Sequence, residues 1–536
     1  MHYWRGVVTH AAILLAQPAY LAVQYVLGHP RSPLNLTIHV GVWVYVVTRI
    51  SIPFFTSPLR QLPSPPGEKW LIGHLNFNGG RPPTKVFEDM INGTPNDGLI
   101  AIWLPLYLRC EIIPTRPDTL MDLLNSHGYD WEKPSLQKRV LAGMLGQGLA
   151  TVEGAEHKAM RRVLTPAFSG RVIRDQAPLF YTKGIGLTDV MTRQVKETGE
   201  GVLEMGSLLS RVSLDIIGAA GVGMEFNTVE NEDSPLPKLY YSVVRPPAFF
   251  MLINLFFPQW LLRQLRWTGV ARNLEAQSQL RKELNILLQE KKEQMKHEES
   301  AHDSKDIIAS IMKAGDFSDD YLFSQLLTTI SAGHDTTASA LTWATWLLAS
   351  HPDIQDRLRA ECIAQLADIP TSEVDASNFD TDKMPFLSAV CNESLRLYPP
   401  APGTSRNSVV PTTIGKYHIP QGTPAVITAW AINRSRDLWG ADAAEFKPDR
   451  WLEGPHAANG GAETPHAFIT FLHGPRSCIG QAFARLEMKC LLAALFTRFR
   501  FEIADPDQKV EVGGFIIIKP EAGMRLKVFD LKQKDS

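Results

Sequence analysis

The 536-residue chain has few cysteines for its length and no excess of charge of either sign. Its five cysteines are an odd number spread along the chain, which excludes a disulfide framework and indicates a reducing compartment. Lys and Arg number 54 against 56 Asp and Glu, so the net charge of −2 provides no general positive field, and no nucleic-acid partner is expected. Apolar residues make up 44%, enough for a large core and too few for a protein with many membrane spans.

Uncharged apolar stretches lie near the N-terminus. Residues 7–27 contain no Asp, Glu, Lys or Arg, and a helix of that length spans a bilayer core. Residues 32–48 form a second, shorter stretch, so that one span and a hairpin of two both fit. A cleaved signal peptide is the rival interpretation, but the first stretch is too long and no clear small-residue cleavage site follows it. Arg49, Arg60 and Lys69 come next, and the positive-inside rule then places the remainder in the cytoplasm.

Prolines separate this region from the rest of the chain. Pro63, Pro65 and Pro66 fall in residues 62–70, where they fix φ and remove backbone donors, so a stiff hinge is expected there. No further linker and no internal repeat follows. We therefore expect residues 1–61 to be a membrane anchor and residues 71–536 to form a single catalytic domain.

One interior stretch, residues 246–262, is also uncharged. A buried helix pair and a surface that dips into lipid both fit it, while its prolines argue against a clean span.

Helical periodicity dominates the body of the chain. Apolar residues recur at three-to-four spacing, as in amphipathic helices, in residues 155–167, 274–314, 319–350, 352–367 and 383–398. Strand signals are fewer, and their β-branched residues are interrupted by Gly or Pro, as in small antiparallel sheets. They cover residues 418–430, 509–518 and 524–531. A mainly α fold with small antiparallel β-sheets is expected.

One late segment has the composition of a metal-ligand loop. It follows the pattern F-x-x-G-x-R-x-C-x-G, with the fixed positions filled by Phe471, Gly474, Arg476, Cys478 and Gly480. Glycines let the backbone turn closely around the sulfur, backbone N–H groups can hydrogen-bond a thiolate, and the N-terminus of the helix expected next favours negative charge. A lone cysteine is more often a small buried hydrophobe, which we expect of the other four. Here the pattern favours an anionic sulfur bound to a metal.

This segment resembles the heme-binding loop of the cytochrome P-450 superfamily. The resemblance implies the cytochrome P-450 fold and a heme b cofactor whose iron has Cys478 as its axial thiolate ligand. A thiolate donates electron density to iron and favours O–O cleavage over reversible oxygen binding. The resemblance places Phe471 beside the sulfur and pairs Arg476 with a heme propionate. It extends from about Leu62 to Asp530.

Three further residues match a structural network of the family. Glu393 and Arg396 are three residues apart on a helical pattern and so share a face. Alone, such a pair is usually a solvated surface contact. The resemblance adds Arg450 of the later segment "FKPDRW" as their buried partner, with a role in folding and none in the bond chemistry. Asp449 stands where the family more often has Glu.

A polar interruption occurs inside an apolar helical pattern at residues 331–340, "SAGHDTTASA". Gly333 leaves room for a ligand, while Asp335 and Thr336 place an acid and a hydroxyl where they can divert the helix hydrogen bonds. A chance polar stretch in a surface helix is the alternative, but the flanking residues are apolar. The segment resembles the family motif A-G-x-D/E-T-T, which implies that Thr336 and Asp335 deliver protons during oxygen activation.

Three more basic residues are candidates for binding the heme propionates. Arg161 matches the family's W-x-x-x-R, in which His157 replaces Trp and can still donate a hydrogen bond. Arg406 matches a further propionate-binding position. Ordinary surface charges are the rival interpretation for the two arginines.

The resemblance implies a membrane-bound heme-thiolate monooxygenase of the endoplasmic reticulum, which inserts one atom of O2 into a lipophilic small molecule. No nicotinamide- or flavin-binding fingerprint is visible, so electrons from NADPH must arrive through a partner, a cytochrome P-450 reductase with cytochrome b5 as a further donor. Candidate docking residues, with solvated charges as the rival interpretation, are Lys158, Arg162, Arg485 and Lys489.

The motifs are similar in style to those of fungal microsomal members of the family, which tailor secondary metabolites. A fatty-acid or xenobiotic hydroxylase is the alternative within the fold, because fold does not select substrate. A heme sensor, an electron carrier, or a heme-thiolate isomerase or dehydratase are alternatives of other classes, against which the Asp335–Thr336 pair argues. The apolar segments 326–330, 401–404 and 515–517 favour a lipophilic substrate.

Overall fold

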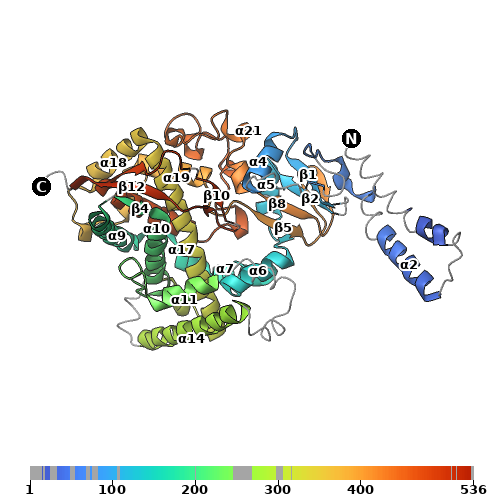
Figure 1. The fold of residues 1–536 in the computed structure, drawn as a ribbon, viewed down its shortest axis with the longest axis horizontal. Coiled ribbons are helices and arrows are strands. Elements are labelled where there is room, and N and C mark those ends of the chain that lie inside the picture. Colours follow the sequence, from blue (N-terminus) through green and yellow to red (C-terminus); the bar gives the residue numbers. More distant parts are fainter. Residues whose placement is uncertain are drawn as a thin grey trace. The chain divides into compact units, whose positions relative to one another are not determined.

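The computed structural model describes most of the chain (Figure 1). The described residues are 15, 18–24, 33–48, 55–67, 73–74, 83–105, 109–199, 201–244, 269–296, 306–315, 317–508, 510–514 and 516–532. The first predicted span, 7–27, is therefore described only in part, and the uncharged interior stretch 246–262 lies outside the described residues.

Backbone contacts divide the chain into two compact units, each assembled from segments that are far apart in the sequence. Unit 1 comprises residues 1–134, 403–444 and 463–476. Unit 2 comprises residues 135–402, 445–462 and 477–536. The single domain expected over residues 71–536 stays a prediction.

A five-stranded sheet organises unit 1, in the order β1-β2-β8-β5-β3. Its strands are β1 (Leu99–Trp103), β2 (Cys110–Pro114), β8 (Pro424–Ile427), β5 (Thr404–Ser408) and β3 (Trp131–Glu132). All five residues of β1 are buried, and the first four, 99–102, belong to the main apolar core of this unit. The β2–β8 pair is parallel, with Ile112 opposite Ala425, whereas the other pairs are antiparallel. Strand signals alone predict no such parallel pair, because its two strands are separated by most of the chain.

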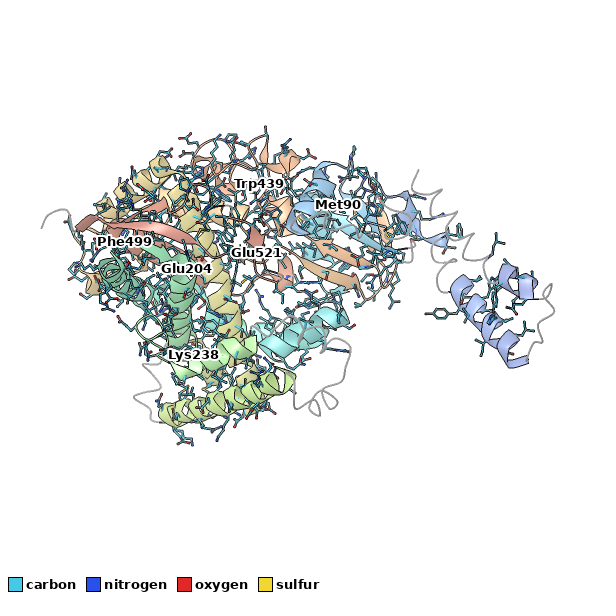
Figure 2. The ribbon with its side chains drawn as sticks, in the orientation of Figure 1. Met90, Glu204, Lys238, Trp439, Phe499 and Glu521 are labelled. Carbon is cyan, nitrogen blue, oxygen red and sulfur yellow. The ribbon has the colours of Figure 1, made fainter. Side chains whose placement is uncertain are left out.

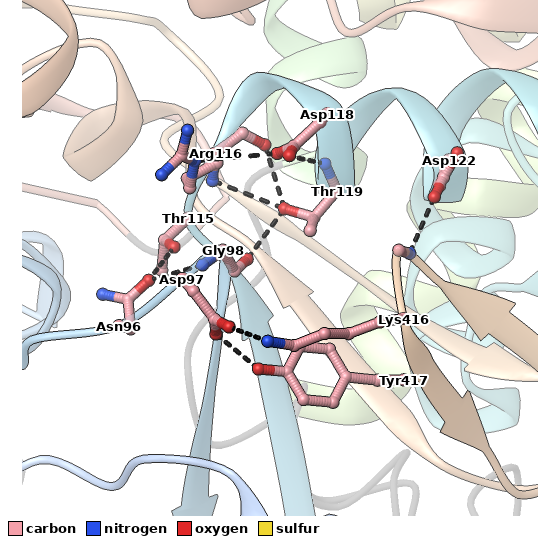
Figure 3. Close-up of polar contacts among 11 residues, drawn as sticks. Asn96, Asp97, Gly98, Thr115, Arg116, Asp118, Thr119, Asp122, Lys416 and Tyr417 are labelled. Atoms are coloured by element: carbon pink, nitrogen blue, oxygen red, sulfur yellow. Dashed lines mark hydrogen bonds and ion pairs between the residues drawn. The ribbon is translucent and has the colours of Figure 1, made fainter.

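A small hairpin of β6 (Thr412–Ile414) and β7 (Tyr417–Ile419) is tied to the start of β1 (Figure 3). Lys416 and the hydroxyl of Tyr417 both bind the carboxylate of Asp97, just before β1. The backbone N–H of Gly415 donates to Oδ2 of Asp122 over 2.7 Å. These contacts connect distant segments within unit 1.

Short helices complete unit 1. They are α2 (Pro33–Val46), η2 (Pro58–Gln61), α4 (Pro83–Asn92), α5 (Pro117–Met121), η4 (Asp122–Ser126), α20 (Ala429–Ile432), α21 (Arg436–Trp439), η11 (Pro465–Ala467) and η12 (Gly474–Arg476). Helix α2 falls on the second predicted apolar stretch, 32–48, and its large apolar side chains, among them Leu36, Val40 and Tyr45, are exposed.

Unit 2 is largely helical. Its longer helices are α6 (Ser135–Leu145), α7 (Gly154–Leu164), α9 (Ala177–Thr198), α10 (Met205–Ile216), α11 (Pro235–Val244), α14 (Gly269–Lys296), α17 (Asp319–Ser350), α18 (Pro352–Leu366), α19 (Pro385–Leu397) and α22 (Gln481–Arg498). Short elements are η5 (Thr165–Phe168), α8 (Gly170–Arg174), η6 (Ile217–Val222), α16 (Ile307–Lys313), η7 (Thr371–Glu373), η8 (Ala376–Phe379), η9 (Pro448–Trp451) and η10 (Ala457–Asn459).

Helix α17 is the central element of unit 2 (Figure 1) and packs against α10, α19 and α22. Its bounds confirm the predicted helix 319–350, and α18 and α19 confirm the next two within two residues at each end. The helix predicted over 274–314 is instead described as α14 and α16, with residues 297–305 outside the described part. Among the described residues one apolar segment, Met205–Val222, has the length and composition of a membrane span, and it is mostly buried in the core.

Two small antiparallel sheets belong to unit 2. One has the order β4-β12-β9, formed by β4 (Val202–Glu204), β12 (Arg525–Asp530) and β9 (Phe499–Ile503). The other pairs β10 (Val512–Gly513) with β11 (Lys519–Pro520). The mainly α fold with small sheets is confirmed, although among the described residues of segment 509–518 only Val512 and Gly513 are strand.

Candidate active site

Cys478 differs from the other cysteines in its exposure. It is exposed, whereas Cys110 is half-buried and Cys362, Cys391 and Cys490 are buried. It lies two residues before the N-cap of α22, Gly480, whose backbone N–H hydrogen-bonds its sulfur. An accessible sulfur beside a helix N-terminus is the arrangement that a metal-binding cysteine requires.

The Cys478 thiol has opposing electrostatic influences. The residue has exposed surface, but protein atoms packed near it partly desolvate the sulfur, and this burial raises the pKa of the thiol. The Gly480 N–H and the Arg161 guanidinium lower the pKa in part. A coordinated metal cation removes the proton of a thiol outright. The site therefore favours a neutral thiol in the metal-free chain and a thiolate when iron is bound.

Backbone geometry in the segment before the cysteine explains its glycine. Gly474 has a φ of +73°, and a Cβ there would lie 2.1 Å from the carbonyl oxygen of Leu124. Leu472 has a positive φ of 56°, a strained conformation for a branched side chain. Phe471 packs edge to face on Phe468, with ring centroids 6.5 Å apart. This part of the loop is fixed within unit 1.

The arginines predicted to bind propionates hydrogen-bond to backbone carbonyls and to a side chain of their own units. In unit 1, Nε of Arg476 donates to the Gly128 carbonyl over 3.1 Å, and Nη1 of Arg406 donates to Oγ1 of Thr404 over 2.8 Å. In unit 2, Nη1 of Arg161 donates to the Ser477 carbonyl over 2.6 Å, next to the cysteine.

His157, one turn before Arg161 on α7, is only 3% exposed. The propionate contacts of Arg161, Arg406, Arg476 and His157 stay predictions.

One face of α17 is uncovered at the polar interruption. Ala332 is exposed and Gly333 and Thr336 are half-buried, although the neighbouring turns of this helix are buried. The Thr336 hydroxyl donates to the Ala332 carbonyl over 2.8 Å. A Cβ at Gly333 would lie 2.6 Å from the side chain of Ile217, so this glycine also makes room for η6. The open face carries the hydroxyl that the sequence predicts for catalysis.

Asp335 is directed elsewhere. Its Oδ1 lies 2.8 Å from Nζ of Lys519 on β11 and 3.3 Å from Nε2 of His334. The carboxylate lines a pocket of about 430 Å³ in unit 2, whose wall also includes Glu204 and Lys238, both labelled in Figure 2. The acid and the alcohol, although adjacent in sequence, therefore have different surroundings.

The network of Glu393, Arg396 and Arg450 is formed and buried. Oε1 of Glu393 lies 2.8 Å from Nη2 of Arg396 and 2.9 Å from Nε of Arg450, and Nε1 of Trp451 donates to Oε2 over 2.9 Å. Burial opposes the charged form of Glu393, but these donors outweigh it and hold the pKa of the carboxyl below its usual range. Asp449 instead pairs with Arg357 at the surface.

The four candidate docking residues differ in exposure. Lys158 and Arg162 are exposed on α7. Arg485 and Lys489 on α22 are half-buried, and Nζ of Lys489 donates to the Phe379 carbonyl over 3.0 Å. Within this set Lys158 and Arg162 are the fully exposed members, and the docking role of all four residues stays a prediction.

Two residues of interest, Lys519 and Glu487, belong to none of the sequence motifs and were not predicted. Lys519 is 184 positions from Asp335 in the chain, and no local pattern predicts that pair. Glu487 is the one acidic residue of α22 and lies between Arg485 and Lys489, so the sequence does not mark it as a buried acid.

Comparisons with known proteins agree with this geometry. The family model "Cytochrome P450" matches residues 111–528. Cytochrome P450 monooxygenase sphH of Aspergillus fumigatus is 37% identical over 490 residues, covering 89% of each chain. Cytochrome P450 monooxygenase ptmK of Penicillium ochrochloron is 31% identical over 506 residues, covering 92% of this chain and 97% of that protein.

Among solved structures, a crystal structure of a cytochrome P450 has the same fold, with a TM-score of 0.71 at 22% identity, covering 88% of this chain and 98% of that one. The accessible thiol of Cys478, its Gly480 N–H and the open face of α17 fit the heme that this family carries. The chain therefore belongs to the cytochrome P450 family and is a heme-thiolate monooxygenase.

Proposed function

We propose that this monooxygenase is membrane-bound, takes electrons from NADPH through a separate reductase, and oxidises a lipophilic small molecule as a tailoring step of fungal secondary metabolism. The observation that carries the proposal is Cys478, the single exposed cysteine, placed at the N-terminus of α22 with a backbone N–H on its sulfur. Similarity to the fungal monooxygenases sphH and ptmK supports the assignment to fungal metabolism.

The chain supplies the groups that would hold heme. Cys478 would be the axial ligand, while His157, Arg161, Arg406 and Arg476 are the candidate partners of the two propionates. Bound heme supplies the iron centre at which dioxygen is activated. The Gly480 N–H donates to the ligand sulfur and reduces its negative charge.

The proton-transfer steps are assigned to residues of α17. The Thr336 hydroxyl lies on the open face of this helix and can donate a hydrogen bond to a ligand there once it turns from the Ala332 carbonyl. Asp335, at the edge of the 430 Å³ pocket, can take protons from water and pass them to this hydroxyl. Delivery of protons to the correct oxygen is what separates substrate oxidation from loss of electrons as hydrogen peroxide.

Two features support a membrane location and a lipophilic substrate. Helix α2 exposes its large apolar side chains and has no separate polar face, as in a helix that contacts lipid. The uncharged stretch 7–27 adds a sequence long enough to span a bilayer. Endoplasmic reticulum, with the catalytic part in the cytoplasm, is the location that this anchor predicts. Cytochrome b5 is a second candidate electron donor.

The test uses the full chain in microsomes with reductase, NADPH and 18O-labelled dioxygen, and compares the lipophilic metabolites of a fungal extract with and without enzyme. We expect a product that carries one 18O atom and requires NADPH. A product formed without label or without NADPH would overturn the monooxygenase proposal in favour of an isomerase or dehydratase.

A further inference from the structure

A carboxylic acid lies in the core of unit 2, outside the site described above. Glu487 on α22 has no exposed surface, and neither of its carboxyl oxygens has a hydrogen bond of good geometry. A buried carboxylate without a cation is costly, because desolvation of the charge is not repaid. The position therefore requires an explanation other than an ion pair.

Two hydroxyls from two other helices stand beside this acid. Ser213 comes from α10 and Thr337 from α17, and both are close enough to influence the carboxyl of Glu487. Ser213 is fully buried, and its Oγ has no hydrogen-bond partner of good geometry. Glu487, Ser213 and Thr337 thus form a small polar cluster at the junction of three packed helices, which we call the α22 acid cluster.

The hydrogen-bond inventory of the cluster determines where a proton must be. The Thr337 hydroxyl already donates to the Gly333 carbonyl over 3.1 Å, so its oxygen can only accept a further bond. Ser213 has a free O–H that can donate to a carboxyl oxygen. An ionised Glu487 can accept from Ser213 but has nothing to donate to Thr337, whereas a protonated Glu487 satisfies both. The cluster is complete only with the acid neutral.

Electrostatics point the same way. Burial raises the pKa of Glu487 to about 8, although Ser213 and Thr337 oppose the shift. Among the described residues no cation contributes, because the charged groups of the neighbouring helices have other partners. On α10, Arg211 pairs with Glu232 and Asp215 accepts from Thr228, and on α17 Asp335 binds Lys519.

Two further ionisable groups belong to α9 and to α22 itself. Lys183 on α9 pairs with Glu225. Cys490, on the same helix as Glu487, is a buried thiol whose own pKa is raised by its burial and, to a smaller extent, by Glu487.

We propose that Glu487 keeps its proton at neutral pH and donates it to Thr337, so that this acid fixes the Gly333 carbonyl and serves as a positioning residue for the Thr336 segment of α17. The chain of contacts runs from Glu487 through Thr337 to Gly333, three residues before Thr336. It links the helix that follows Cys478 to the helix that carries the catalytic hydroxyl. The effect on Thr336 rests on the proposed function, whereas the protonation of Glu487 does not.

The test compares Glu487→Gln, whose amide can replace both hydrogen bonds without titrating, with Glu487→Leu, which replaces neither. Infrared difference spectra of wild type against Glu487→Gln at pH 7 are expected to contain a protonated carboxyl band that the variant lacks. Thermal unfolding between pH 5 and 9 is expected to show wild type losing stability relative to Glu487→Gln up to about pH 8, because only the unfolded chain releases the proton in that range.

Absence of the carboxyl band at pH 7, or parallel unfolding curves of wild type and Glu487→Gln across that range, would overturn the protonation. Failure of the proposed function would be seen separately, as a protein without a heme band that still passes both measurements.

The positioning role has its own matched pair, Thr337→Val against Thr342→Val. Thr342 lies on the same helix and makes the same kind of bond, donating to the Ala338 carbonyl over 2.7 Å. Thr337→Val and Glu487→Leu are both expected to raise the hydrogen peroxide released per NADPH severalfold, while Thr342→Val and Glu487→Gln stay within twofold of wild type. Equal values for Thr337→Val and Thr342→Val would overturn the positioning role.

Discussion

The ammonium of Lys519 lies 2.8 Å from the carboxylate of Asp335, although the two residues come from a C-terminal strand and the middle of the longest helix. The Asp335 side chain is 9% exposed and that of Lys519 37% exposed, so the pair stands at the rim of its pocket. Strand β11 is attached to the same helix by a second contact, because the Ser339 hydroxyl donates to the Ile518 carbonyl. The acid next to the hydroxyl proposed for catalysis is thus oriented by a residue that no motif contains.

Replacing Lys519 with Met is expected to remove the ion pair that holds the Asp335 carboxylate at the pocket, and to raise the hydrogen peroxide formed per NADPH a few-fold. The reason is that the proposed role of Asp335 is to take protons from water in this pocket, which requires its carboxylate to be held there. Peroxide and NADPH are measured together in the reductase-coupled enzyme. Lys527→Met, an exposed lysine on β12, is the control, and an equal effect of both substitutions would contradict the role of Lys519.

Glu393→Gln is expected to destabilise the fold by about 3–5 kcal/mol, because it leaves two buried guanidiniums without their charge partner. Urea unfolding followed by circular dichroism gives the free energy. Asp449→Asn, which breaks the exposed pair with Arg357, is expected to cost less than about 1 kcal/mol. Similar losses for the two variants would mean that the buried network contributes no more than a surface contact.

The pKa shift of Glu393 also determines how the stability of the fold changes with pH. Because its pKa is lowered in the folded state, the stability that it contributes is present at neutral pH and is lost as the pH falls below the ordinary carboxyl range. Wild type is therefore expected to lose more stability on acidification than Glu393→Gln.

Arg161→Leu is expected to slow alkylation of Cys478 by iodoacetamide in the heme-free protein at a fixed pH. Arg161 lowers the pKa of this thiol, so its loss raises the pKa and reduces the thiolate that reacts. The rate is measured against pH, and the other cysteines react little because they are less accessible. Arg162→Leu, one residue away and exposed, is the control. Unchanged alkylation of Arg161→Leu would remove this arginine from the electrostatics of the site.

Thr336→Ala is expected to retain heme and the spectrum of the ferrous–CO complex while most electrons from NADPH appear as hydrogen peroxide. In the proposed function the hydroxyl carries the proton transfer, an effect typically worth roughly 10²–10⁴ in rate, and has no part in holding the heme. Loss of the heme spectrum in this variant would mean that Thr336 is a structural residue.

Local patterns predicted the parts of the fold that depend on neighbours in sequence. Helices α17, α18 and α19 have apolar periodicity and clear ends, and Gly474 and Gly480 mark the loop around Cys478. Motif spacing also brought Glu393 and Arg396 together correctly, since three residues on a helix share a face.

Contacts between distant segments could not be predicted in this way. The parallel β2–β8 pair joins strands on either side of most of the chain, and the Lys519–Asp335 pair joins a strand to a helix. Side-chain direction was equally hidden, because Asp335 and Thr336 are adjacent in sequence but point to different surroundings. The degree of exposure was hidden as well, because Arg485 and Lys489 are half-buried although their charge suggested full exposure.

The central claim is that Cys478 ligates heme iron as a thiolate. The most direct test is the absorbance difference spectrum of the dithionite-reduced protein with and without carbon monoxide, measured on wild type and Cys478→Ala. A strongly red-shifted Soret band in wild type that is absent from the variant is the predicted result. A folded wild-type protein without a heme band, or a red-shifted band that persists in Cys478→Ala, would contradict the account.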